Sequence, residues 1–73
     1  MRLTLFSTHP CHLCVQAEEL VRRALPSAEL EVVDIGEDDA LIEQYGTLIP
    51  VLVYAEKEIH WPFSLLDIRT LVS

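Results

Sequence analysis

The chain has 73 residues, of which 51% are hydrophobic and 23% are charged, a balance typical of a folded domain rather than a disordered segment. Five basic residues against twelve acidic ones give a net charge of −7, which disfavours binding to the phosphate backbone of nucleic acids. Residues 49–55 form the longest apolar run, far shorter than the roughly 20 residues of a membrane span, and residues 1–6 lack a signal-peptide pattern, so we expect a single cytoplasmic domain over residues 1–73 with no membrane partner.

The first half of the chain predicts a strand, a helix and a second strand. Residues 2–6 form a short apolar run typical of a strand. In 12–24 the apolar residues recur at helical spacing, and Pro26 ends that helix because a proline excludes the preceding residue from the α region. Residues 30–35 are β-branched and partly alternating, which indicates a second strand.

The second half predicts a helix, a hairpin and a final helix. Three acidic residues at 37–39 suit a helix N-terminus, and Gly46 stands where a helix-ending C′ glycine is expected. Residues 51–55 and 58–61 predict two strands joined by a tight turn, and Ser-x-x-Asp at 64–67 has the form of a capping box before the last helix. The order β-α-β-α-β-β-α predicts an α/β fold, in which a four-stranded mixed sheet has a parallel first pair of strands, a terminal hairpin and helices on both faces.

The only two cysteines, Cys11 and Cys14, are spaced as C-x-x-C between the first strand and the first helix. At the helix N-terminus, Cys11 faces unpaired backbone N–H groups and the positive end of the helix dipole, which lower a thiol pKa from ~8.5 into the range ~3.5–7.5. Cys14 lies one turn further on the same face, within disulfide range of Cys11. Because Leu13 and Val15 flank it, Cys14 should be the less exposed of the two. This arrangement predicts an attacking thiol at Cys11 and a resolving thiol at Cys14.

Three interpretations of the cysteine pair remain open at this point. In a reducing compartment, C-x-x-C within a βαβ pattern is typical of a redox motif. A structural zinc site needs four ligands, and His9, His12 and His60 do not supply a matching second pair, so we predict no metal site within one chain. Two cysteines are still compatible with half of an iron–sulfur cluster bridged between two chains. The third interpretation is a pair of buried, unreactive cysteines.

Two histidines near the cysteines are candidate modulators of the site. As an imidazolium, His12 would stabilise the Cys11 thiolate and make the pair more oxidising, although the helix dipole opposes a cation in the first turn. His9 would act in a similar way from the preceding loop. The alternative for His12 is an exposed histidine with no part in the chemistry. Trp61 and Phe63 are expected to pack in the core under the last helix, the alternative being an apolar wall beside the site.

Taken together, the chain resembles a glutaredoxin-like member of the thioredoxin-fold superfamily, closest to a group of small bacterial glutaredoxin-like proteins. The resemblance covers nearly the whole chain and is carried by the strand followed by C-H-L-C at 11–14, by the element order, and by G-T-L-I-P-V-L at 46–52. It implies that a cis peptide bond precedes Pro50 and that the main chain of Ile49 pairs with an extended substrate segment. Leu48, Ile49 and Pro50 are the substrate-binding residues on this basis. The alternative for Pro50 is a trans proline at the start of an edge strand.

The sequence departs from the glutaredoxin pattern where glutathione binds. The loop 7–10 has no lysine before the first cysteine, and 59–63 has no glycine pair before the last helix. The residues between the cysteines are His-Leu where the family usually has Pro-Tyr. We therefore expect no resident cofactor and an external thiol reductant, without the usual features that would select glutathione.

These features predict an enzyme, a monomeric thiol–disulfide oxidoreductase that acts on protein or small-molecule disulfides through Cys11 and Cys14. The alternative is a non-catalytic binding module of the thioredoxin fold, in which the cysteines form a regulatory thiol switch or ligate an iron–sulfur cluster between chains.

Overall fold

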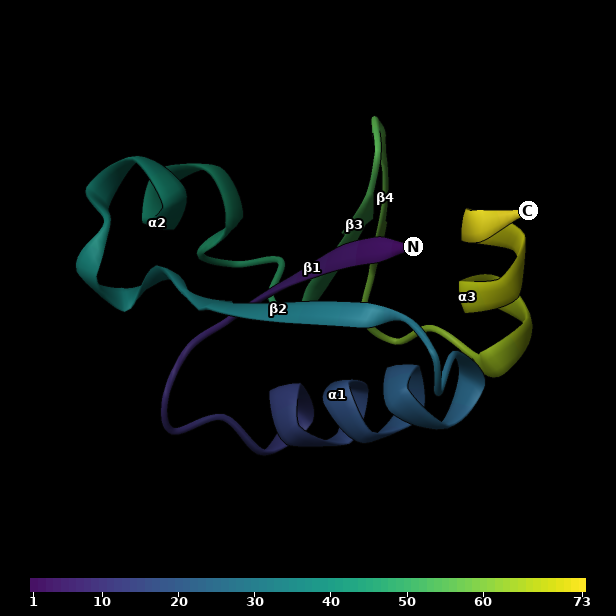
Figure 1. The fold of residues 1–73 in the computed structure, drawn as a ribbon. Helices are drawn as coiled ribbons and strands as arrows, with labels where there is room; N and C mark the ends of the chain where they lie inside the picture. Colours follow the sequence, from purple (N-terminus) through teal and green to yellow (C-terminus); the bar gives the residue numbers. More distant parts are fainter.

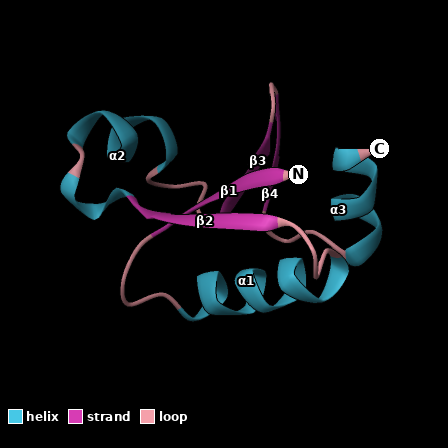
Figure 2. Ribbon diagram, viewed as in Figure 1, coloured by secondary structure: helices cyan, strands magenta, loops and turns pink.

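In the computed structural model, which describes residues 1–73, a four-stranded mixed sheet lies between helices (Figure 1, Figure 2). The strands are β1 (Arg2–Ser7), β2 (Glu29–Asp34), β3 (Val51–Tyr54) and β4 (Lys57–His60). The helices are α1 (His12–Ala24), α2 (Asp39–Tyr45) and α3 (Leu65–Val72), and a 3₁₀ turn, η1 (Ile35–Glu37), precedes α2. The predicted α/β class and the element order β-α-β-α-β-β-α are confirmed.

The sheet has the strand order β2-β1-β3-β4, which places β1 in its interior. β1 runs parallel to β2, with Ser7 opposite Asp34, and antiparallel to β3, with Phe6 opposite Val51. β3 and β4 form the predicted antiparallel hairpin. Because β1 is an inner strand, the loop that connects its C-terminal end to α1 begins in the middle of that end of the sheet.

Because side chains alternate in direction along β1 and β3, the buried apolar residues are divided between the two faces of the sheet. Leu3, Leu5 and Leu52 point to the face covered by α1 and α3, where the larger cluster of nine buried residues lies. That cluster consists of Leu3, Leu5, Ala17, Val21, Ala24, Leu52, Phe63, Ile68 and Leu71. The opposite face, covered by α2, has a cluster of three buried residues, Ile35, Tyr45 and Val51. Figure 1 shows α1 and α2 on opposite sides of the strands, as a three-layer arrangement requires.

Local hydrogen bonds shift some element boundaries from those predicted. Ile35 was expected to end the second strand, but it begins η1 because the carboxylate of Asp34 accepts a hydrogen bond from the backbone N–H of Gly36 at 2.7 Å and turns the chain. Asp38 then caps α2 by accepting from the N–H groups of Ala40 and Leu41, at 3.0 and 3.2 Å. Asp34 and Asp38 therefore cap the 3₁₀ turn and α2 in succession.

The expectation that Gly46 is the C′ glycine is wrong, because Gly46 is the C-cap of α2 itself. Gly46 has φ −52° and ψ −32°, which is the right-handed helical region. It is needed for close approach, because a Cβ at this position would collide with the carbonyl oxygen of Ile42. The residue that has a positive φ is Ala55, at 55°, in the turn between β3 and β4.

The C-terminal part agrees with the sequence in two respects. Ser64 and Asp67 form the predicted reciprocal capping box of α3, with N–H to oxygen distances of 3.1 and 2.9 Å. Phe63 is buried, and Trp61 packs against the same cluster with its ring edge-on to Phe63, the centroids being 5.2 Å apart. Core packing is thus the role of both aromatic residues. No helix has the length and apolar character that crossing a membrane requires.

Candidate active site

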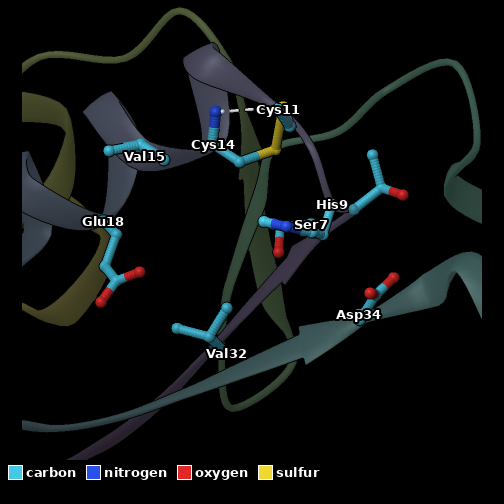
Figure 3. Close-up of a pocket in the computed structure, with 9 residues that line it drawn as sticks. Ser7, His9, Cys11, Cys14, Val15, Glu18, Val32 and Asp34 are labelled. Atoms are coloured by element: carbon cyan, nitrogen blue, oxygen red, sulfur yellow. Dashed lines mark hydrogen bonds between the residues drawn. A yellow bond between two sulfur atoms is a disulfide. The ribbon is translucent and has the colours of Figure 1, made fainter.

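Cys11 and Cys14 form a disulfide at the N-terminus of α1 (Figure 3). Their Cα atoms are 5.3 Å apart, within the usual range for a disulfide. Cys11 is the N-cap of the helix, in an extended conformation with φ −156° and ψ 108°. Its Sγ accepts a hydrogen bond from the backbone N–H of Cys14 at 3.1 Å. The predicted placement of both cysteines on one helical face is therefore confirmed.

The two sulfur atoms differ in accessibility. Cys11 is half-buried, whereas Cys14 is only 5% exposed. The difference arises because Cys14 shares the face of α1 that carries Ala17 and Val21 into the core. A reactant that approaches from solution therefore reaches Cys11 first.

The electrostatic environment of Cys11 comes from the helix itself. α1 has no acidic residue in its first turn and has Arg22 and Arg23 in its last turn. The backbone N–H groups of the first turn have no partners within the helix, and they carry the positive end of the helix dipole. When Cys11 is a free thiol, both effects favour its thiolate form.

A cavity of about 220 Å³ opens beside the disulfide (Figure 3). It lies between the first two turns of α1, the end of β1 with the following loop, and β2. Its lining consists of Ser7, Thr8, His9, Cys11, Cys14, Val15, Glu18, Val32 and Asp34. Of the seven residues predicted for the site, the cavity brings together His9, Cys11 and Cys14. No group of three or more His, Cys, Asp and Glu side chains is placed to hold a metal ion.

The other predicted residues lie outside this cavity. His12 is exposed at the first position of α1. In the segment that leads into β3, Leu48 is 39% exposed, Ile49 is half-buried and Pro50 is fully buried. The peptide bond before Pro50 is cis. The carbonyl oxygen of Pro50 accepts a hydrogen bond from the N–H of Trp61 at 3.1 Å, which ties this segment to the end of β4.

The main chain of Ile49 is only partly free to pair with a substrate segment. The N–H groups of Leu48 and Ile49 both donate to the carbonyl oxygen of Tyr45, at 2.8 and 3.2 Å. The carbonyl oxygen of Ile49 accepts no hydrogen bond from the protein. The resemblance implied pairing through the main chain of Ile49, and in this conformation the carbonyl is the group available for it.

Six residues of the cavity were not predicted as site residues, namely Ser7, Thr8, Val15, Glu18, Val32 and Asp34. Two patterns could have indicated some of these residues as site residues. Cys11, Val15 and Glu18 follow the i, i+4, i+7 spacing of one helical face. Ser7 and Asp34 are register partners at the carboxyl ends of parallel strands, where polar side chains from neighbouring strands meet.

The comparisons with known proteins agree on fold and family. Residues 2–73 match the model of the glutaredoxin-like domain family (DUF836). The X-ray structure of the Northeast Structural Genomics target protein XcR50 from X. campestris is similar with a TM-score of 0.85 and 35% sequence identity, covering 96% of this chain and 93% of that one. The solution structure of the same target is similar with a TM-score of 0.82 and 36% sequence identity, covering 99% of this chain and 92% of that one.

A structure of a malarial protein, at 15% identity and a TM-score of 0.66 over 97% of this chain and 91% of that one, shares the fold. No curated protein matches the chain. The thioredoxin-like fold implied by the sequence is confirmed, and the C-x-x-C pair at a helix N-terminus fits a thiol-redox role. The chain belongs to the glutaredoxin-like domain family (DUF836).

Proposed function

We propose that the protein is a thiol–disulfide oxidoreductase in which Cys11 is the attacking residue and Cys14 the resolving residue. The observation that carries this proposal is the difference between the two sulfur atoms. Cys11 is half-buried and caps α1, and its Sγ accepts a hydrogen bond from the N–H of Cys14, whereas Cys14 is 5% exposed. An activated, reachable thiol with a sheltered partner is suited to a two-step exchange, and the Cα atoms of the two cysteines are 5.3 Å apart.

The exchange begins from the reduced pair. The backbone N–H groups of the first turn lower the pKa of the Cys11 thiol, and its thiolate attacks one sulfur of a substrate disulfide. An S–S bond forms between Cys11 and that sulfur, and the other substrate sulfur leaves as a thiolate that takes up a proton. Cys14, after losing its proton, attacks the sulfur of Cys11, closes the Cys11–Cys14 disulfide and releases the second substrate thiol. Two electrons have then passed from the cysteine pair to the substrate.

The remaining predicted residues have supporting roles in this proposal. The free carbonyl of Ile49 accepts a backbone N–H of the substrate, Leu48 offers an exposed apolar contact, and the buried Pro50 holds both in place. His9, which lines the cavity, and His12, which is exposed beside Cys11, modulate the thiolate. An external thiol reductant restores the reduced pair, with no resident cofactor and with the protein acting as a cytoplasmic monomer.

The first test is the reduction potential of the cysteine pair. The protein is equilibrated in glutathione buffers of defined ratio, and its free thiols are counted after quenching. A potential between about −200 and −270 mV, the range of glutaredoxins and thioredoxin, is expected. If no disulfide forms at any buffer ratio, the pair is not redox-active and the proposal is wrong.

The roles of the two cysteines are tested by trapping. The reduced Cys14→Ser variant should hold a substrate thiol as a long-lived mixed disulfide on Cys11, because the resolving step is absent. Mass spectrometry of the trapped species locates the bond, and the Cys11→Ser variant is the matched control. Trapping at Cys14 in that control, with none in Cys14→Ser, reverses the roles. Multiple turnovers at substoichiometric protein distinguish an enzyme from a thiol switch.

A further inference from the structure

The cavity beside the disulfide lies on the β2 side of β1, whereas residues 48–50 lead into β3 on the other side. Its walls are partly apolar, because Val15 and Val32 are 56% and 41% exposed and both line it. A substrate held by the Ile49 carbonyl therefore leaves this second flank of the disulfide open. Figure 3 shows Ser7 and Val32 below the cysteines, with Glu18 on one side of them and Asp34 on the other.

Ser7 indicates that the cavity is suited to a polar ligand. It is 7% exposed and is the buried polar residue of the molecule. Its hydroxyl makes no hydrogen bond within the protein. Because no fully enclosed polar side-chain atom lacks a partner, the hydroxyl oxygen of Ser7 is not fully enclosed and is accessible from the cavity that Ser7 lines. Because it stays accessible from the cavity, this hydroxyl can form a hydrogen bond with water or with a polar group of a ligand.

The charge of the cavity is negative. Two carboxylates line it, those of Glu18 and Asp34, and no Lys or Arg does, so that His9 is the one lining residue that can become a cation. Glu18 pairs with Arg22 at 3.0 Å, which balances its charge. Asp34 bonds only the backbone N–H of Gly36, through one of its oxygens, so its charge has no cationic partner. The cavity therefore favours a cation that approaches Asp34.

The volume limits what the cavity can hold. At about 220 Å³ it is smaller than the roughly 300–1,000 Å³ of pockets for drug-sized ligands. It suits one long side chain, whose methylene groups contact Val15 and Val32 while its charged end stays near Asp34 and the hydroxyl of Ser7.

We propose that this cavity is a subsite for a basic side chain of the substrate, so that the preferred substrates are protein disulfides with Lys or Arg next to the cysteine. The inference rests on the proposed oxidoreductase function. Because Cys11 lines the cavity, the mixed disulfide on Cys11 brings the residues that flank the substrate cysteine to its mouth. The subsite adds specificity to the exchange and changes none of its steps.

The test uses three symmetric peptide disulfides, each made from N-acetyl-X-Cys-X-amide with X as lysine, norleucine or glutamate. Norleucine has the methylene groups of lysine without its charge. The second-order rate constant for oxidation of the reduced protein is measured by acid quenching and thiol alkylation. The lysine peptide should react fastest and the glutamate peptide slowest, and the ratio of lysine to norleucine rate constants is the readout.

Three substitutions distinguish an effect of the cavity from an effect of the negative net charge of the whole protein. Asp34→Asn keeps an oxygen for the N–H of Gly36 and removes the charge, so the ratio should fall about two- to five-fold, as for loss of a partly exposed ion pair. Asp38→Asn removes the same charge from a cap outside the cavity, and the ratio should not change. Val32→Lys places a tethered cation in the cavity and should lower the ratio as Asp34→Asn does.

The outcomes are distinguishable from one another. A fall with Asp34→Asn and Val32→Lys, but not with Asp38→Asn, supports the subsite. An equal fall in all three variants, or equal rate constants for the lysine and norleucine peptides with the unmodified protein, overturns it while leaving the oxidoreductase proposal intact. If no peptide is reduced, including the uncharged one, the oxidoreductase proposal itself fails.

Discussion

Reduction of the Cys11–Cys14 disulfide should lower the stability of the fold by an amount that depends on pH. The two cysteines are separated by 3 positions, so the bond closes a very short loop. For a loop of this length the chain-entropy model gives about 2 kcal/mol of stabilisation. In a domain of this size, that corresponds to a decrease in Tm of roughly 8–16 °C on reduction.

Ionisation of Cys11 in the reduced protein acts in the opposite direction. The thiol has a pKa of about 8.5 in the unfolded chain, and we expect the N-terminus of α1 and the N–H of Cys14 to lower it in the folded state. A group whose pKa is lowered on folding contributes its full stability above the unfolded pKa, and that stability is lost as the pH falls through the folded pKa. A pKa lowered by one unit is worth about 1.4 kcal/mol. The oxidised form should therefore be the more stable by about 2 kcal/mol at acidic pH, and this difference should shrink as the pH rises towards about 8.5.

The assay is urea unfolding of the oxidised and reduced forms between about pH 5.5 and pH 9, across the expected range of thiol ionisation. The fluorescence of Trp61, the only tryptophan, reports unfolding because its ring packs against Phe63. Apart from the thiol of Cys14, which is only 5% exposed, the other titrating groups are common to the two forms and largely cancel in the difference. A difference that stays constant with pH would show that Cys11 is not activated, and one that grows with pH would refute the assumed sign of the pKa change.

Three further predictions concern single residues. His12→Ala should raise the pKa of the reduced Cys11 thiol if the imidazolium stabilises the thiolate, and an unchanged titration of thiolate absorbance would remove His12 from the mechanism. Leu5→Ala, at a fully buried position, should cost about 2–5 kcal/mol in urea unfolding, and a smaller loss would show that α1 and α3 collapse into the space. Gly46→Ala should destabilise by about 1–3 kcal/mol because its Cβ collides with the backbone of α2, and a neutral result would mean that this turn shifts freely.

Much of the site was predictable because local rules determine it. The apolar spacing of 12–24 gives α1 and its buried face, and that face accounts for the burial of Cys14. The position of Cys11 immediately before the first helical residue makes it the N-cap. Both inferences depend only on the sequence of one helix, so they do not require knowledge of its tertiary contacts.

The parts that escaped prediction depend on how separate elements meet. The cavity requires the register that places Ser7 opposite Asp34, and the short polar ends of two strands carry no periodic signal for it. The N–H of Ile49 donates a hydrogen bond to the carbonyl oxygen of Tyr45, at the end of α2. Residue type alone predicts a C′ glycine at Gly46, whereas Gly46 is the C-cap of α2 and its close approach to Ile42 is what excludes a side chain there.

The unequal size of the two clusters has a consequence for local unfolding. The face of the sheet covered by α2 has a cluster of three buried residues, whereas the other face has a cluster of nine. Segments with few buried apolar contacts open at a lower free energy than the whole domain, so amides of α2 should exchange with deuterium before those of α1. When the last turn of α2 frays, Tyr45 releases the N–H of Ile49. Fraying of α2 would thereby determine whether Ile49 presents one backbone group or two to an incoming strand.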